Sequence, residues 1–290
     1  MKNKKSSSYI VPFSLGVASL SMSYVVLSQL AFCLTDSYGM SAILVGTIFL
    51  ASRFFDGFTD IIAGFIIDKT HTKWGKARPF DLFAIPLWIC LLLCFNIPHF
   101  RLVGKVIWVF LAYNMCQSVC YTFTTVAQTV RIKRSLPEKM HSKALSIAGL
   151  VSTVVSTIVG ILSPTLIAIF QNKPHGWTII IGCFAIPGII MSIIQFISLP
   201  EINEEIEEKV EKVTIKEAVK ALLANKYIFL VAFAVMIMAM VNTILATSGS
   251  YYFKYVVNDL KMLSVVNLIS MIGYRSEEHT SELQSLSRIS

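Results

Sequence analysis

Long apolar runs follow one another along most of the chain, and short polar segments separate them. Each run has about the length of the roughly 20 residues that an α-helix needs to cross a bilayer. The expected membrane spans are residues 9–34, 41–67, 79–97, 106–130, 144–170, 177–199 and 227–251, and a further apolar run begins near residue 262. This pattern predicts an all-α polytopic membrane protein.

Composition and charge narrow the class of protein. Of the 290 residues, 55% are hydrophobic and 14% are charged, whereas soluble domains carry about 25% charged residues. The formal net charge is +8, but Lys and Arg gather on one expected membrane side, in residues 1–8, 68–78, 131–143 and 200–226. Cytoplasmic loops of membrane proteins show this bias. We therefore expect a plasma-membrane protein with a cytoplasmic N-terminus, surrounded by the lipid bilayer and without a nucleic-acid partner.

One charged segment divides the chain into parts. In residues 200–226, charges alternate with apolar residues at helical spacing, which predicts a cytoplasmic linker with an amphipathic helix along the membrane. The linker separates a six-helix bundle, residues 1–199, from the start of a second bundle, residues 227–274. Residues 275–290 resemble a translated sequencing-library adapter, and we set them aside as a non-native tail. We therefore expect a truncated membrane protein that is inactive by itself.

The second expected span carries three charged residues. Arg53, Asp56 and Asp60 are three and four residues apart, so they share one helix face. A charge near the bilayer centre costs roughly 2.5 to 3.5 kcal/mol, and Arg53 can neutralise only one carboxylate. The other carboxylate needs a cation, a proton or a partner from another helix. We interpret Asp56 and Asp60 as a candidate site for Na⁺ or a proton, with a buried ion-pair cluster that sets helix register as the alternative.

The fourth expected span carries larger polar side chains on one helical face. These residues recur every three or four positions and are Asn114, Ser118, Tyr121, Thr125 and Gln128. Amide and phenol side chains are too large to serve only as close packing between helices, so they predict a cavity lined by water or sugar. Asn242, Thr243 and Thr247 on the seventh span could face the same space.

A membrane enzyme is a rival interpretation of the paired aspartates. Membrane prenyltransferases use Asp-x-x-x-Asp pairs to hold Mg²⁺ and a diphosphate, but they need two such motifs on different helices. No second motif occurs in this sequence. We therefore expect no enzymatic activity and no cofactor other than a coupling ion, Na⁺ or H⁺.

Several motifs resemble one transporter family. The second span and its loop read RFFDGFTD and GFIIDKTHTKWGKARP, and further matches are GTIFLASRFFD, YTFTT and YYFKYVVND. They resemble the glycoside–pentoside–hexuronide:cation symporters, the melibiose-carrier branch of the major facilitator superfamily, over nearly all of residues 9–274. The resemblance implies about twelve helices in two bundles, with a midplane substrate site and alternating access. This chain would hold the N-terminal six-helix bundle and the start of the second.

The resemblance also implies roles for individual residues. Asp56 and Asp60 match the family's cation-binding aspartates, and Thr122 matches a cation-site threonine on the fourth span. Thr59 stands where the melibiose carriers place an asparagine ligand. The coupling-ion side of the family's site is therefore retained.

The sugar side departs from the melibiose carriers. Their aspartate on the first span is replaced by Ser19 or Leu20, and their aspartate on the fourth span by Thr125. A nearby aromatic residue is replaced by Thr129. The resemblance therefore disfavours a melibiose-like galactoside and leaves another sugar or glycoside as the expected substrate.

These observations predict a cation-coupled symporter of a sugar or glycoside. One alternative is a cation-coupled carrier of a lipid-like or other non-sugar solute. A second, from a different class, is a membrane receptor or scaffold without transport activity, in which Asp56 and Asp60 could become Asn without effect.

Overall fold

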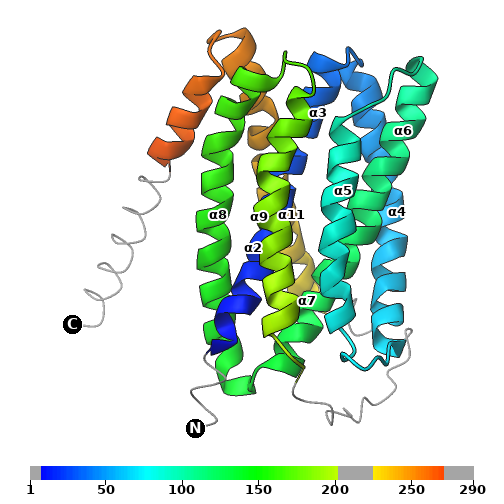
Figure 1. Ribbon diagram of the computed structural model, residues 1–290, viewed down its shortest axis with the longest axis vertical. Helices are drawn as coiled ribbons and strands as arrows, with labels where there is room; N and C mark the ends of the chain where they lie inside the picture. Colours follow the sequence, from blue (N-terminus) through cyan, green and yellow to red (C-terminus); the bar gives the residue numbers. More distant parts are fainter. Residues whose placement is uncertain (1–7, 202–224, 271–290) are drawn as a thin grey trace.

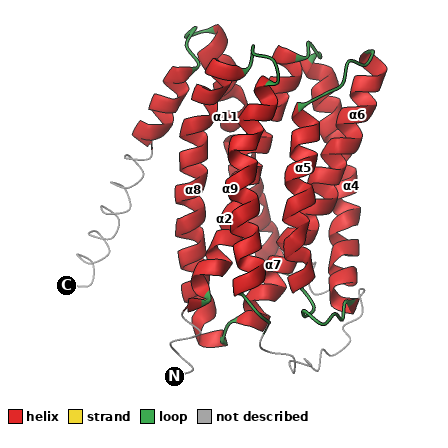
Figure 2. Cartoon of the chain, viewed as in Figure 1, coloured by secondary structure: helices red, strands yellow, loops and turns green. Residues whose placement is uncertain are grey.

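The computed structural model describes residues 8–201 and 225–270. Within these ranges the chain forms seven helices that are long and apolar enough to cross a membrane (Figures 1 and 2). They run over Ile10–Ser37, Ala42–Lys69, Arg78–Phe95, Leu102–Ser135, Glu138–Phe170, Gly176–Ser198 and Tyr227–Tyr255. The predicted all-α polytopic fold is confirmed, and each expected span coincides with one of these helices. The leader, the linker's amphipathic helix and the adapter-like tail lie outside the described residues.

Several spans consist of more than one helical segment. The first contains α2 (Ile10–Ser28), α3 (Leu30–Phe32) and the π-helix η1 (Cys33–Ser37), and the second is α4 (Ala42–Lys69). The third contains the 3₁₀-helix η2 (Arg78–Phe83) and α5 (Ala84–Phe95), and the fourth contains α6 (Leu102–Asn114), the π-helix η3 (Met115–Tyr121) and α7 (Thr122–Ser135). The others are α8 (His141–Phe170) after the short η4 (Glu138–Met140), then α9 (Gly176–Ser198) and α11 (Lys226–Tyr255). An additional apolar helix covers Lys261–Ser270.

The first span lies inside the bundle because small residues let its neighbours approach closely. Ser19 donates a hydrogen bond of 2.8 Å to the carbonyl of Gly188 on α9, and Ser192 donates to Ser19 at 3.0 Å. A Cβ atom on Gly16 would overlap the side-chain amide of Gln195. Small residues therefore allow α2 and α9 to pack closely in the bundle core.

A charge cluster is buried where the third span begins and the fourth and sixth spans end. The Arg131 side chain is 0% exposed, and its Nε lies 3.1 Å from Asp81. Its Nη1 lies 3.7 Å from Glu201, and Nη2 donates to the carbonyl of Leu199. The Glu201 carboxylate also accepts hydrogen bonds of 2.7 to 2.9 Å from the backbone N–H groups of residues 76–78.

This cluster corrects one expected boundary. Arg131 was expected in a basic loop, but it lies in α7, which continues to Ser135. Glu201, expected in the linker, follows the end of α9 and is held against the loop between α4 and η2. In Figure 1 this loop lies at the same end of the bundle as the start of α2.

Helix α11 contacts the first span near one end only. Ser250 donates to Gln29 at 2.8 Å, and Lys254 and Tyr255 both bind the Asp36 carboxylate at 2.5 Å. Most of α11 before residue 247 is exposed among the described residues. The helix is therefore attached through its C-terminal turns, and its remaining length borders open space.

Candidate cation and substrate site

The second and fourth spans are joined by three side-chain hydrogen bonds. Each pair is separated by 62 positions in sequence, and successive pairs are four residues apart. The three bonds are Asn114 Nδ2 to Ser52 Oγ at 3.0 Å, Ser118 Oγ to Asp56 Oδ1 at 2.5 Å, and Thr122 Oγ1 to Asp60 Oδ1 at 3.0 Å. We call this set the polar ladder. It places a hydroxyl group on each of the two carboxylates.

Local helix geometry explains why these residues meet. Ser41 accepts a hydrogen bond from the backbone of Leu44 at 3.3 Å and so caps the start of α4. Positions 52, 56 and 60 then lie on one face of α4. On the fourth span, η3 is a π-helix, whose i→i+5 bonding changes the phase of the following residues relative to a regular α-helix. Ser118 lies within η3, and Thr122 is the first residue of α7.

The two carboxylates differ in their partners. Arg53 Nη1 lies 3.1 Å from Asp56 Oδ2, and the side chains of Arg53 and Asp56 are 58% and 17% exposed. Asp60 is exposed at the bundle surface and forms no ion pair with a basic residue in the described part of the chain. With both carboxylates ionised, the cluster carries a net charge of −1. Such a charge at membrane depth must face a water-filled cavity, another protein surface or a bound cation.

The oxygen atoms around this charge suit a monovalent cation. Asp56 and Asp60 offer carboxylate oxygens, and Ser118 and Thr122 offer hydroxyl oxygens beside them. Oxygen ligands of this kind are those that hard cations prefer. Thr59 lies on the same helix, but its hydroxyl donates to the carbonyls of Phe55 and Asp56 at 2.9 and 3.0 Å. The Thr59 oxygen could therefore bind a cation only through a lone pair, while its proton stays on the helix backbone.

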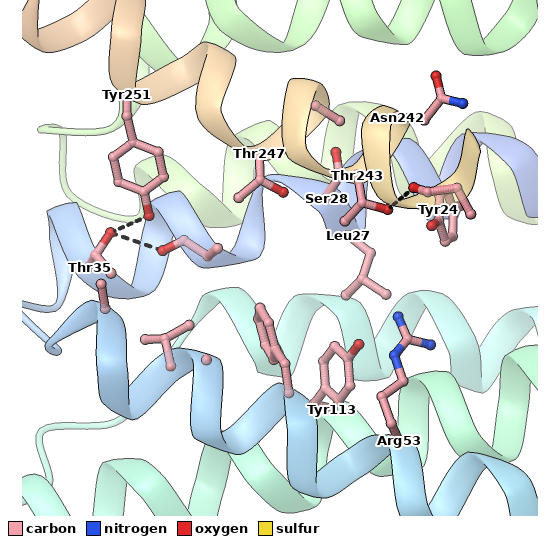
Figure 3. A pocket seen from close by; sticks show the side chains of 17 residues that line it. Tyr24, Leu27, Ser28, Thr35, Arg53, Tyr113, Asn242, Thr243, Thr247 and Tyr251 are labelled. Carbon is pink, nitrogen blue, oxygen red and sulfur yellow. Dashed lines mark hydrogen bonds between the residues drawn. The ribbon is translucent and has the colours of Figure 1, made fainter. Parts of the chain in front are cut away.

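A cavity of about 640 Å³ lies beside this cluster, between the first, second, fourth and seventh spans (Figure 3). Its polar or aromatic lining residues are Tyr24, Ser28, Thr35, Phe49, Arg53, Tyr113, Asn242, Thr243, Thr247 and Tyr251. Arg53 is the one charged side chain among the described residues that line it. Because Arg53 also pairs with Asp56, the cavity and the carboxylate cluster share a residue.

None of the five residues expected to line a cavity on the fourth span lines this one. Asn114 and Ser118 belong to the polar ladder. Tyr121 packs against Tyr24, with ring centroids 6.3 Å apart. Thr125 is exposed, and Gln128 forms a reciprocal amide pair with Gln195 at 2.8 and 2.9 Å inside the bundle.

Depth in the bundle is the physical reason for this difference. The cavity is lined by α4 residues between 42 and 53, whereas Ser118 and Thr122 lie beside positions 56 and 60, farther along α4. Asn242, Thr243 and Thr247, expected on the seventh span, do line the cavity.

The sequence interpretation also missed the aromatic residues of this cavity. Tyr24, Phe49, Tyr113 and Tyr251 lie on four different segments, and each stands in an apolar run where an aromatic residue reads as ordinary packing. The one available signal, which the sequence interpretation did not use, is the spacing of Tyr24, Ser28 and Thr35 along the first span. The aromatic wall required the three-dimensional arrangement.

A bundle of helices long and apolar enough to cross a membrane, with charged residues at the edge of a cavity, is the architecture of a multi-pass membrane protein. Comparison with known proteins agrees with this class, because the model of the MFS/sugar transport protein family matches residues 12–274. The chain belongs to this family. Its members are transporters and not enzymes, so the expectation of no enzymatic activity is confirmed.

Individual relatives carry the names of sugar carriers. The chain is 30% identical over 268 residues to the isoprimeverose transporter of Lactiplantibacillus pentosus, covering 90% of this chain and 56% of the relative. It is 29% identical to the symporter YnaJ of Bacillus subtilis, covering 91% and 57%. It is 26% identical to the glucuronide carrier protein homolog of Escherichia coli, covering 82% and 53%. The chain thus spans about half the length of the curated relatives it matches.

Proposed function

We propose that this protein acts as a cation-coupled symporter, which carries a sugar or glycoside across the plasma membrane together with Na⁺ or H⁺. The observation that carries the proposal is the carboxylate pair Asp56 and Asp60, hydrogen-bonded by the polar ladder and joined through Arg53 to a cavity. The names of the sugar-carrying relatives support the substrate class.

The charge of the cluster explains why a cation would bind. Two carboxylates and one guanidinium leave one uncompensated negative charge, which a single monovalent ion neutralises. Asp60 is the first position for such an ion, because Arg53 lies at Asp56. Ser118 and Thr122 hold the two carboxylates in place and provide further oxygen atoms. Neutralisation lowers the cost of moving this face through an apolar environment, so cation binding favours one conformation over the other.

Arg53 provides the link between ion and substrate. A cation held at Asp60 that is also coordinated by Asp56 competes with the guanidinium for the Asp56 carboxylate. When the guanidinium is released from Asp56, it remains at the cavity wall, where it can bind a substrate oxygen. Substrate then binds more tightly when the cation is present, and linkage requires the reverse as well.

The basic segments support the proposed orientation. The loops that follow α4 and α7 lie at the end of the bundle where α2 starts (Figure 1). The positive-inside rule assigns that end to the cytoplasm. The α4 residues that line the cavity lie between 42 and 53. The cavity therefore occupies the outer half of the bundle, away from the basic loops.

Uptake of radiolabelled glycosides tests the proposal in cells that express the gene product, including any extension of the reading frame beyond residue 290. We expect accumulation that depends on Na⁺, Li⁺ or pH, and Asp56→Asn and Asp60→Asn abolish this dependence. Asp259→Asn is the matched control, because Asp259 is an exposed carboxylate outside the site. Accumulation that ignores all three cations, or that keeps its coupling in Asp56→Asn, contradicts the proposal.

A carrier of a lipid-like solute is the second candidate. The apolar lining residues favour it, among them Leu27, Ala31, Val45, Ala239 and Ala246. Uptake of a panel that contains both glycosides and long-chain alcohols separates the two candidates. The substrate class is the one whose accumulation depends on the coupling cation.

A further inference from the structure

We propose that the cavity binds the pyranose ring of an uncharged glycoside by stacking it on Phe49, with hydroxyl groups held by Tyr24, Tyr113 and Thr247. This inference rests on the proposed function and names how its substrate is bound. The sugar-gripping positions of the melibiose carriers do not serve here: Ser19 bonds within the bundle core, and Thr125 lies outside the cavity.

The first observation is an aromatic wall. Phe49 is half-buried and lines the cavity, so part of its ring remains open to a ligand. Tyr113 stacks on Phe49, with ring centroids 4.9 Å apart and an interplanar angle of 24°. Tyr113 is 5% exposed, so it holds the Phe49 ring in one orientation. A fixed aromatic ring suits the flat face of C–H groups on a pyranose.

The second observation is a set of hydroxyl groups without partners. In the described part of the chain, the hydroxyls of Tyr24, Tyr113 and Thr247 take part in no hydrogen bond, yet all three residues line the cavity. Other hydroxyls nearby are already engaged: Thr35 pairs with Tyr251 at 2.7 Å, and Thr243 donates to its own helix at 2.8 Å. Polar groups inside a cavity with no protein partner are groups that a ligand can satisfy.

The third observation is the opposition of these two features. Tyr113 and Arg53 project from one side of the cavity, and Thr243, Thr247 and Tyr251 project from the other (Figure 3). A pyranose has an apolar face and a rim of hydroxyl groups, so it can contact the Phe49 ring with its face and the Thr247 hydroxyl with its rim. A linear polyol lacks the rigid face, and an alkyl chain leaves the hydroxyls unsatisfied.

The fourth observation concerns charge. Arg53 is the one charged side chain lining the cavity in the described residues, and Asp56 already pairs with it. After one monovalent cation binds, Arg53, Asp56, Asp60 and the ion sum to zero. An anionic sugar would leave a net negative charge, so the arrangement favours an uncharged glycoside and a cation-to-sugar ratio of one.

Binding to the purified chain tests this inference, because the contacts it names, Phe49, Tyr24, Tyr113 and Thr247, all lie within the described residues. The probes are the methyl β-pyranosides of xylose, glucose and galactose, with methyl β-glucuronide, mannitol and decanol for comparison. Isothermal titration in NaCl at neutral pH measures each dissociation constant. We expect at least one neutral pyranoside to bind more tightly than all three comparison probes.

Three variants locate the contacts. Phe49→Leu should weaken binding of that pyranoside about tenfold, and Tyr113→Phe and Thr247→Val should each weaken it roughly 3- to 10-fold. Phe54→Leu is the matched control, because Phe54 lies on the same helix, is 71% exposed and does not line the cavity. Circular dichroism melting checks that each variant is folded.

Several results would overturn the inference. These are no pyranoside binding by the wild-type chain, mannitol or decanol binding as tightly, or equal losses in Phe49→Leu and Phe54→Leu. Tighter binding of the glucuronide would refute the charge argument. The proposed function fails separately: if uptake remains coupled to a cation while Phe49→Leu changes nothing, only the binding mode is wrong. If Asp56→Asn leaves uptake unchanged, the symport mechanism is wrong whatever Phe49 does.

Discussion

Replacing Arg131 by methionine should strongly destabilise the bundle. The substitution removes the guanidinium from Asp81 and Glu201, whose side chains are 0% and 3% exposed. It also removes the hydrogen bonds to Ser135 and to the Leu199 carbonyl. Removal of one partner from a buried ion pair costs about 3 to 5 kcal/mol, because it leaves a buried charge without compensation.

The size of the chain converts this cost into a measurable shift. For proteins of this size a loss of 1 kcal/mol lowers Tm by roughly 2 to 4 °C, so Arg131→Met should lower it by about 6 to 20 °C. Thermal unfolding in detergent micelles, followed by circular dichroism, measures the shift. Arg131→Lys should give an intermediate value, because lysine keeps the charge but cannot bind several partners at once.

Two further variants decide whether the charge is the cause. Arg101→Met is the control, because Arg101 is exposed before α6, and it should change stability by no more than about 0.5 kcal/mol. Adding Asp81→Asn and Glu201→Gln to Arg131→Met removes the uncompensated charges and should restore at least half of the lost Tm. If Arg131→Met behaves like Arg101→Met, or if the added substitutions lower Tm further, the reasoning is refuted.

Three other predictions concern separate parts of the molecule. Ser118→Ala removes the hydroxyl that donates to Asp56, and should raise the cation concentration for half-maximal uptake by about tenfold. The control is Thr129→Val, because the exposed Thr129 hydroxyl bonds only its own helix, and it should leave this concentration unchanged. Gly188→Ala places a Cβ 2.4 Å from the ring of Trp88 and should cost about 1 to 3 kcal/mol in unfolding free energy; Gly182→Ala on the same helix meets nothing within 4 Å, and an equal loss there contradicts the packing argument. Burial raises the pKa of Tyr38 above its usual 10.0. The neutral Tyr38 side chain therefore contributes fully to folding stability below pH 10, and this contribution is lost as the pH rises through the folded-state pKa. Tm should fall more steeply above pH 10 in the wild-type chain than in Tyr38→Phe, and parallel curves of Tm against pH would contradict this.

The spans and the carboxylate pair could be predicted from the sequence because they depend on local pattern. Apolar length determines where a helix can cross a bilayer, and helical spacing alone places Arg53, Asp56 and Asp60 on one face. The resemblance to a known family added Thr122, and the structure places its hydroxyl 3.0 Å from Asp60. The role of these residues in cation binding remains a prediction.

The cavity and the buried charge cluster could not be predicted in the same way. A phenylalanine such as Phe49 has the same sequence signature whether it packs in a core or lines a cavity, and only the neighbouring helices distinguish the two. Arg131 follows an apolar run and precedes other basic residues, so charge counting assigned it to a loop. Its burial depends on Asp81 and Glu201, which are 50 and 70 positions away in sequence.

The π-helix η3 makes the polar ladder sensitive to the type of helix as well as to residue type. A π-helix holds an additional residue compared with the α-helix that would replace it. If Met115–Tyr121 became regular α-helix with all its residues retained, Thr122 would rotate by about 100° around the helix axis relative to Asn114. Its hydroxyl would then leave Asp60, although every side chain of the ladder would still be present in the sequence.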